Sequence, residues 1–243
     1  MGENAAFDSK IDIGDGAATQ PDSDQGPGWL PEPSRGYQIA KRALDLVLSL
    51  AFLILWAPLL LLIVIAIKLD SPGPVLFRQQ RVGLRGKLFT LWKFRTMHIA
   101  TDSSLRREYV QKLIEIAPSE NASQQPHYAL RNDPRITRVG RLLRRLSFDE
   151  FPQFVSVLAG DMSLVGPRPA LHYEVAAYQE WHKLRFSCKP GITGLGQVSG
   201  RSRLSFDEMV RLDIYYANHS SIWRDLKILL RTPFAVLGDP GAY

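Results

Sequence analysis

The segment ALDLVLSLAFLILWAPLLLLIVIAI, which occupies residues 43–67, is almost entirely apolar and decides how the rest of the chain is arranged. As a helix, its 25 residues would reach roughly 38 Å, whereas the hydrocarbon core of a bilayer is about 30 Å thick. Length alone therefore favours one tilted helix that crosses a membrane. An interior proline, however, removes a backbone hydrogen bond and clashes with the preceding turn. The sequence thus predicts a break in this helix near Ala57 and Pro58.

The charges on either side of the segment favour a different topology. Lys41 and Arg42 precede it, and Lys68 and Arg78 follow it. Because basic residues collect on the cytoplasmic side of a membrane, both flanks prefer the same side. A helix that enters the membrane, breaks at Pro58 and returns would satisfy this preference. The residue pattern alone leaves a spanning and a re-entrant helix open.

Composition narrows the classes of partner. The chain has 243 residues, a formal net charge of +6 and a single cysteine, Cys188, so it forms no internal disulfide. An excess of positive charge suits nucleic acid, an anionic membrane surface or phosphorylated substrates. Binding to nucleic acid would leave the apolar segment unexplained, so we expect no nucleic-acid partner. A non-enzymatic scaffold on a membrane surface is the alternative to an enzyme.

These patterns divide the chain into three regions. Residues 1–36 are rich in Gly, Asp, Ser and Pro and carry seven acidic residues against two basic ones, which predicts a disordered acidic tail. Residues 37–68 would form the membrane-embedded helix. Residues 69–243 would form a compact cytoplasmic catalytic domain with interfacial helices. We expect a helix-rich α+β fold.

Several elements of the third region can be predicted from local patterns. Two strand-like runs between residues 74 and 97, separated by Gly83 and Gly86, predict a small β-hairpin. Residues 103–116 are typical of a helix, and residues 118–126 are typical of a polar loop.

Two later segments predict basic amphipathic helices. The first would begin with Asp133 as the helix cap and Pro134 in the first turn, and would continue to Leu146 with apolar residues at helical spacing. The second runs from Trp223 to Leu237. Arginine and lysine on the polar faces suit a layer of lipid headgroups. An ordinary solvated face explains the same pattern.

The stretch LSFDEFPQ at residues 146–153 places two carboxylates side by side. Ser147 and Glu150 match the S-x-x-E capping box, so a purely structural explanation exists. The pentapeptide LSFDE also recurs at residues 204–208, and at least one copy should be only a helix start. The first copy is followed by GDMSLVGPRP at residues 160–169, in which two prolines stiffen the backbone around Arg168. This context favours the first copy as the chemical one.

The residue types in this region suit phosphoryl chemistry. Asp149 and Glu150 could ligate Mg²⁺, which prefers one or two carboxylates together with waters and substrate phosphates. A carboxylate can also act as a nucleophile, and an arginine can balance the charge of a phosphate. The glycine-rich run at residues 189–201 is either a phosphate-binding loop or a tight surface loop.

Taken together, the chain resembles the bacterial sugar transferases, also called monotopic phosphoglycosyl transferases, from about Lys41 to its last residue. The motifs that carry the resemblance are KRALD (41–45), DSPGPV (70–75), KFRTM (93–97), the acid pair, GPRP (166–169) and PGITGL (190–195). The compact size is similar to that of the short members that initiate exopolysaccharide synthesis.

The resemblance implies transfer of a hexose 1-phosphate from a UDP-hexose to undecaprenyl phosphate, with release of UMP. It assigns this reaction to the cytoplasmic face of the bacterial inner membrane and leaves open both the hexose, galactose or glucose, and the oligomeric state, a homodimer included. Asp149 would be the nucleophile and a ligand of Mg²⁺, and Glu150 would assist it. Basic residues would surround the phosphates: Lys93, Arg95, Arg144, Arg168 and Arg201.

The resemblance also implies that the apolar segment is a re-entrant helix hairpin in contact with membrane lipid, with its break at Pro58. One departure concerns the residue before this proline. Many relatives have serine there, whose hydroxyl can help to satisfy freed backbone groups, whereas this chain has Ala57.

Overall fold

The structure, a computed structural model, describes residues 28–98, 135–200 and 204–238. The predicted helix at 103–116, the predicted loop at 118–126 and Arg201 lie outside the described residues. The helices are α2 (Arg35–Leu55), α3 (Ala57–Asp70), α5 (Arg138–Arg145), α6 (Gln153–Ala159), α7 (His172–Val175), α8 (Glu180–Lys183), α9 (Leu195–Ser199), α10 (Phe206–Asn218) and α11 (Ile222–Gly238). The strands are β1 (Leu76–Val82), β2 (Leu88–Phe94), β3 (Ser163–Val165), β4 (Ala170–Leu171) and β5 (Gly191–Thr193). Short 3₁₀ turns are η1 (Leu84–Gly86), η3 (Phe148–Glu150) and η4 (Leu184–Ser187).

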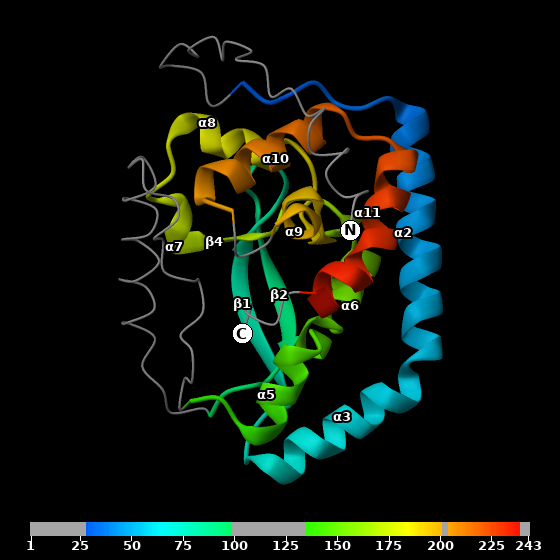
Figure 1. Ribbon diagram of the computed structural model, residues 1–243, viewed down its shortest axis with the longest axis vertical. Helices are drawn as coiled ribbons and strands as arrows, with labels where there is room; N and C mark the ends of the chain where they lie inside the picture. The colour runs from blue at the N-terminus through cyan, green and yellow to red at the C-terminus, as the bar shows by residue number, and fades with distance from the viewer. Residues whose placement is uncertain (1–27, 99–134, 201–203, 239–243) are drawn as a thin grey trace.

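Helices α2 and α3 form a bent pair along the edge of the molecule (Figure 1). Trp56 separates them, and Pro58 lies in the first turn of α3, where a missing N–H is tolerated. The two helices are bent by 62°, so the predicted break is confirmed. Among the described residues, no individual helix is long and apolar enough to cross a bilayer, whereas this bent pair reaches that length and hydropathy together.

The first half of α2 is attached to the rest of the molecule by its polar side chains. Asp45 is 4% exposed, and its Oδ1 accepts hydrogen bonds of 3.0 Å from Ser163 Oγ and from Leu164 N at β3. The guanidinium of Arg42 donates to two carbonyl oxygens in the last turn of α6, at 2.7 and 2.9 Å. The carboxylate inside the apolar segment therefore accepts hydrogen bonds from the folded domain in place of water.

The predicted hairpin is confirmed as β1 and β2, with Gly83 and Gly86 in its connection. Strand β4 pairs antiparallel with the other edge of β1, which gives a three-stranded sheet in the order β2-β1-β4. Strands β3 and β5 pair in parallel as a separate two-stranded sheet. The helix-rich α+β class is therefore confirmed, with small sheets.

Apolar side chains pack in three clusters. One lies between β2, α6, β3 and the helices α9, α10 and α11, and includes Leu91, Val165 and Tyr216. A second lies between β1, β4 and α10. A third joins the inner face of α3 to β2 and α5 through Ile67, Phe94 and their neighbours. Figure 1 shows the hairpin running along the centre of the molecule, with α5 and α3 at one end and α8 and α10 at the other.

Helix α5 begins later than the sequence predicts. The helix starts at Arg138, and Thr137 caps it, because Thr137 Oγ1 accepts a hydrogen bond of 2.9 Å from Gly140 N. Ile136 is still extended and forms a β-bridge with Met97. Asp133 and Pro134, with which the predicted helix begins, lie outside the described residues, and pairing with the hairpin holds Ile136 outside the helix.

Two other predictions concern the ends of the chain. The helix predicted between Trp223 and Leu237 is confirmed as α11, with Pro233 inside it. Residues 28–34, which we assigned to the tail, contact the folded body: Leu30 N donates to Ser187 Oγ at 3.0 Å, and Glu32 pairs with Arg85. The folded part of the chain therefore begins before the predicted boundary at residue 36. The earlier residues of the tail lie outside the described part.

Candidate active site

The acid pair lies in a tight turn between α5 and α6. Ser147 has φ 56° and ψ 21°, the left-handed conformation that non-glycine residues rarely adopt. The next three residues form η3, and the side chain of Ser147 makes no capping hydrogen bond. The capping-box explanation, the structural alternative, therefore does not hold for this copy. The sharp turn instead directs Asp149 inward, where it is 7% exposed.

A lysine from the hairpin meets both carboxylates. Lys93 Nζ lies 2.6 Å from Glu150 Oε1 and 3.8 Å from Asp149 Oδ2. Strand β2 positions this lysine, and η3 positions the two acids. The structure thus brings together three of the residues predicted for the site, from two segments that are more than fifty residues apart in the sequence.

The pKa of Asp149 is raised to about 6, chiefly because burial disfavours its charged form. The positive charges of Lys93 and Arg144 lower this pKa, and the negative charge of Glu150 raises it. At neutral pH the carboxyl group is therefore largely ionised, yet it is more basic than an exposed aspartate. Such a group is a better nucleophile than an ordinary carboxylate while it keeps its charge.

Arg144 reaches the site from α5, and contacts with the end of the hairpin fix its position. Its Nε donates to Thr96 Oγ1 at 2.9 Å. Helix α5 can approach this closely because Gly140 has no side chain: an added Cβ would lie 2.2 Å from Thr96 O. The predicted cation is thus held beside the acid pair by a side chain that the sequence analysis did not single out.

The acid pair alone could supply only some of the ligands of a magnesium ion. Asp149 Oδ1 is buried and has no hydrogen-bond partner among the described residues, so it has a free acceptor position. The described residues contain no cluster of three or more His, Cys, Asp or Glu side chains that could hold a metal. This donor set suits Mg²⁺, which completes its octahedral shell with waters and substrate phosphates.

Arg95 has a different setting from the one predicted for it. It is 5% exposed, and its guanidinium donates to the carbonyl oxygens of Ser71 and Pro72 at 2.6 and 2.9 Å and to Ser71 Oγ at 2.9 Å. These acceptors follow directly on the end of α3, whose last carbonyls lack partners inside the helix. Arg95 therefore ties the end of α3 to β2. Its contact with a phosphate stays a prediction.

Arg168 lies in the loop between β3 and β4, and its side chain is exposed between two buried prolines. Hydrogen bonds hold the loop at several backbone atoms: Gly166 N donates to Thr193 O at 2.9 Å, and Gly191 N donates to Pro167 O at 2.8 Å. The side chain of Arg168 makes no hydrogen bond or ion pair with any residue that the structure describes. These bonds fit the rigid presentation expected of this loop, which stays a prediction.

The first part of the glycine-rich run that begins at Lys189 is a strand rather than a surface loop, and phosphate binding by the run stays a prediction. Its first part forms β5 and packs against the Arg168 loop so closely that backbones touch. A Cβ on Gly191 would lie 2.1 Å from Gly166 N, and a Cβ on Gly194 would lie 2.2 Å from Gly166 O. These glycines thus permit backbone packing beneath the loop, and Gly191, Gly194 and Gly196 are buried.

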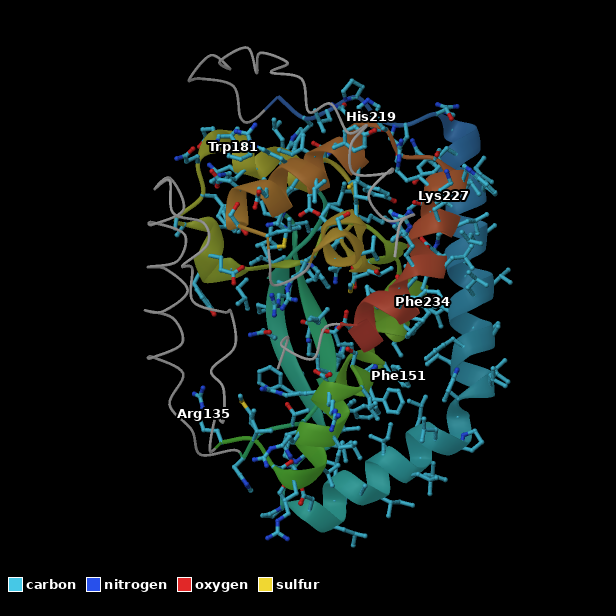
Figure 2. All side chains as sticks on the ribbon, viewed as in Figure 1. Arg135, Phe151, Trp181, His219, Lys227 and Phe234 are labelled. Carbon is cyan, nitrogen blue, oxygen red and sulfur yellow. The ribbon has the colours of Figure 1, made fainter. Side chains whose placement is uncertain are left out.

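An aromatic cluster, which the sequence analysis missed, connects the acid pair to the helix bend. Phe148 and Phe151 flank Asp149 and Glu150, and their rings lie 4.7 Å apart. Phe151 meets Phe52 of α2 edge-on at 4.8 Å, and Phe148 faces Trp56 at the bend at 6.5 Å. Figure 2 shows Phe151 inside the angle between α2 and α3. The acid pair is therefore beside the apolar helix pair, although neither sequence periodicity nor spacing indicated this contact.

Comparison with known proteins agrees with this arrangement. Residues 36–239 match the family model described as bacterial sugar transferase, and the chain belongs to that family. It is 40% identical over 86% of its length to the undecaprenyl-phosphate galactose phosphotransferase of Salmonella typhimurium. It is 42% identical over 88% of its length to the UDP-glucose:undecaprenyl-phosphate glucose-1-phosphate transferase of Caulobacter vibrioides. It is 35% identical over 89% of its length to the exopolysaccharide production protein ExoY of Rhizobium meliloti.

The relatives differ in how much of their own length the match covers. The matched region is 43% of the Salmonella protein, 75% of the Caulobacter protein and 96% of ExoY. The chain therefore spans less than half the length of the first of these relatives and nearly all of the last. The shared part contains the bent helix pair and the acid pair.

Proposed function

We propose that this protein transfers a hexose 1-phosphate from a UDP-hexose to undecaprenyl phosphate, releases UMP and forms undecaprenyl-diphosphate-hexose. The observation that carries the proposal is the buried Asp149, ionised at neutral pH, beside Lys93 and Arg144 and next to an apolar helix pair. A charged nucleophile at the edge of a lipid-facing segment suits a reaction between a water-soluble donor and a lipid acceptor. The names of the relatives supply the donor and acceptor classes.

In the first half-reaction, a carboxylate oxygen of Asp149 attacks the β-phosphorus of the donor. The bond between this phosphorus and the bridging oxygen breaks, and the bridging oxygen leaves with UMP. The hexose phosphate is then bound to Asp149 as an acyl phosphate. Lys93 and Arg144 stabilise the negative charge that collects on the phosphoryl oxygens, which is the main requirement of phosphoryl transfer.

In the second half-reaction, a phosphate oxygen of undecaprenyl phosphate attacks the same phosphorus. The bond to Asp149 breaks, so the carboxylate is regenerated and the hexose is joined to the lipid through a diphosphate. Glu150 is placed to accept a proton from the lipid phosphate, because it adjoins Asp149 and its carboxylate is only partly buried. Its ion pair with Lys93 keeps it oriented toward the site.

Mg²⁺ is the proposed cofactor, with Asp149 as its protein ligand through the unpartnered Oδ1. When bound, the ion would neutralise the diphosphate of the donor and make UMP a better leaving group. Arg168 would bind a phosphate oxygen of the donor from the loop between β3 and β4, as a planar guanidinium does well.

The bent helix pair is proposed to enter the cytoplasmic leaflet of the inner membrane and return to the same face. Its exposed side chains include Ile54, Leu55, Leu61 and Leu62, each more than 60% exposed, which water does not favour. The bend at Trp56 would then be the deepest point. Phe52 and Phe151 would line the route by which the acceptor's phosphate reaches Asp149 from the lipid.

The test is UMP release by the full-length protein in detergent, supplied with Mg²⁺, undecaprenyl phosphate and UDP-glucose, UDP-galactose or UDP-N-acetylhexosamines in parallel. Continuous UMP release that depends on the acceptor supports the transfer. Without the acceptor, we expect a burst of UMP that approaches one equivalent of enzyme, because the hexose phosphate stays on Asp149. No UMP release with any donor from folded protein would contradict the proposal and favour the scaffold alternative.

A further inference from the structure

Behind the loop that carries Arg168 lies a buried ion pair that the proposed chemistry does not use. Arg185 from η4 and Asp213 from α10 are each 3% exposed, and Arg185 Nη2 lies 2.6 Å from Asp213 Oδ2. Moving two charges out of water costs about as much as their attraction returns, so apolar residues of similar volume often serve stability as well. Stability alone therefore does not account for a pair at this position.

The remaining hydrogen bonds of Arg185 indicate what the pair does. Its Nη2 also donates to the carbonyl oxygen of Arg168 at 3.2 Å, and its Nη1 donates to Tyr178 Oη at 3.1 Å. Asp213 and Tyr178 thus hold the guanidinium on two sides, so its direction toward the Arg168 carbonyl is fixed. The carbonyl belongs to the residue whose side chain projects from the loop.

Neighbouring carbonyls of the same loop have other donors. Arg81 Nη1 donates to Pro169 O at 2.8 Å, and Gly191 N donates to Pro167 O at 2.8 Å. If Arg185 were lost, these bonds would remain, but the Arg168 carbonyl would lose the donor that Asp213 and Tyr178 hold in place. Because the ring of Pro169 fixes the backbone dihedral that follows this carbonyl, the carbonyl can shift only together with the Cα of Arg168, and such a shift would redirect the guanidinium.

We infer that Arg185, held by Asp213, is a positioning residue that orients Arg168 toward the diphosphate of the nucleotide donor. The inference rests on the proposed function, in which Arg168 binds a phosphate oxygen. A side chain that is already oriented loses less conformational entropy when the donor binds, so affinity for the donor rises. Arg185 itself touches neither the donor nor Asp149 in this arrangement.

The test is a double-mutant cycle between positions 185 and 168, measured as kcat/KM for UMP release. Arg185→Lys keeps a positive charge beside Asp213, but one ammonium group cannot replace the planar guanidinium that bonds Asp213, Tyr178 and the Arg168 carbonyl together. We expect Arg185→Lys to lower kcat/KM about tenfold, mainly through a higher KM for the donor. In the Arg168→Ala background, the same change should lower kcat/KM by less than about twofold, because the side chain that it orients is gone.

A second variant protects the test against simple misfolding. Arg185→Met combined with Asp213→Leu removes both charges, so neither is left buried and unpaired. It should unfold near the wild-type temperature and still show the raised KM. The matched control is Asp225→Asn, which alters another fully buried carboxylate, on α11. Asp225→Asn should change kcat/KM by the same factor in the wild type and in the Arg168→Ala variant.

The outcomes distinguish failure of the positioning role from failure of the proposed function. Equal losses from Arg185→Lys with and without Arg168 would overturn the positioning role and leave the proposed function intact. Wild-type kcat/KM in Arg168→Ala would overturn the phosphate role of Arg168 and the positioning role together. The inference is supported if Arg168→Ala lowers kcat/KM strongly and if Arg185→Lys lowers it only when Arg168 is present.

Discussion

The same five residues, LSFDE, occur at 146–150 and at 204–208, and the fold uses them in opposite ways. In the second copy, Ser205 Oγ accepts from Glu208 N at 3.3 Å, and Glu208 Oε2 accepts from Ser205 N at 2.8 Å. This reciprocal pair is a capping box, and the regular helix α10 follows it. In the first copy, Ser147 is left-handed and a 3₁₀ turn follows.

The two aspartates differ as a result. The side chain of Asp207 is 32% exposed and lies 3.3 Å from Nε2 of the buried His182. The side chain of Asp149 is 9% exposed and faces Lys93, with a second acid beside it. The pKa of Asp149 is raised to about 6, chiefly by burial, although both aspartates belong to the same pentapeptide. Burial and neighbouring cations, not the pentapeptide, therefore distinguish a chemical carboxylate from a helix start.

Exchanging each aspartate for asparagine should give the largest difference in activity between the two copies. Asp149→Asn should lower UMP release about a thousandfold or more, because the amide cannot form the acyl phosphate. Asp207→Asn should leave the rate close to that of the wild type, since Asp207 lies at the start of α10 and pairs with His182 rather than with the acid pair or Lys93. The two variants are measured side by side in the UMP assay after equal recovery from membranes. Similar losses in both would mean that burial does not mark the nucleophile.

Removing the positive charge of Lys93, which faces both acids of the first copy, should have the next largest effect. Lys93→Met should lower kcat/KM about a hundredfold, as loss of one electrostatic stabiliser of a transition state commonly does. It should also raise the pKa of Asp149, because the positive charge of Lys93 holds that pKa down. Since the ionised form is the nucleophile, the acidic limb of the kcat/KM profile should move to higher pH. A limb that stays in place while the rate falls would exclude Lys93 from the environment of Asp149.

A change at the second acid should move the same limb the other way. The negative charge of Glu150 raises the pKa of Asp149, so Glu150→Gln should lower it. In the wild type, activity should fall as the pH drops through about 6; in this variant, the fall should begin at a lower pH. The pH profile separates this shift from any loss of rate caused by removing a proton acceptor. Movement to higher pH would contradict the assigned charge of Glu150.

The smallest effects should appear in stability rather than activity. Ser205→Ala removes the cap of α10 and should lower the free energy of unfolding by about 1 kcal/mol. Ser147→Gly should raise it slightly, by roughly 0.5 kcal/mol, because glycine adopts the left-handed conformation without strain. Thermal or denaturant unfolding of both variants measures the difference. Equal destabilisation at the two serines would mean that the first copy also depends on a cap.

Local patterns were enough to predict the elements that depend on residues close together in the sequence. The hairpin follows from alternating residues around Gly83 and Gly86, and the break follows from the missing N–H of Pro58. The start of α5 could not be predicted in this way, since it depends on the bridge between Ile136 and Met97, which are distant in the sequence. Asp133, the local cap that the sequence offers, lies outside the described residues, and the cap of the described helix is Thr137.

The candidate site shows the same division. Its acids and cations could be named from motifs, but their partners could not. Arg95 looks like any basic residue of a phosphate site, and only the fold reveals that it bonds carbonyls at the end of α3. Likewise, the segment that contains Gly191 and Gly194 has the glycine content of a phosphate-binding loop, but these glycines permit tight backbone packing. Sequence therefore identifies which residues carry chemistry better than it identifies what each of them touches.

The attachment of Asp45 has a consequence for the order of events during synthesis. Its hydrogen-bond partners, Ser163 and Leu164, are made 118 and 119 residues after it. Until then, a lone carboxylate interrupts the apolar segment, and burying it in lipid would be costly. On the proposed topology, stable insertion of the first half of α2 must therefore await translation of β3. Ribosome-bound chains that end before residue 163 should be extracted from membranes more readily than chains that extend well beyond residue 164.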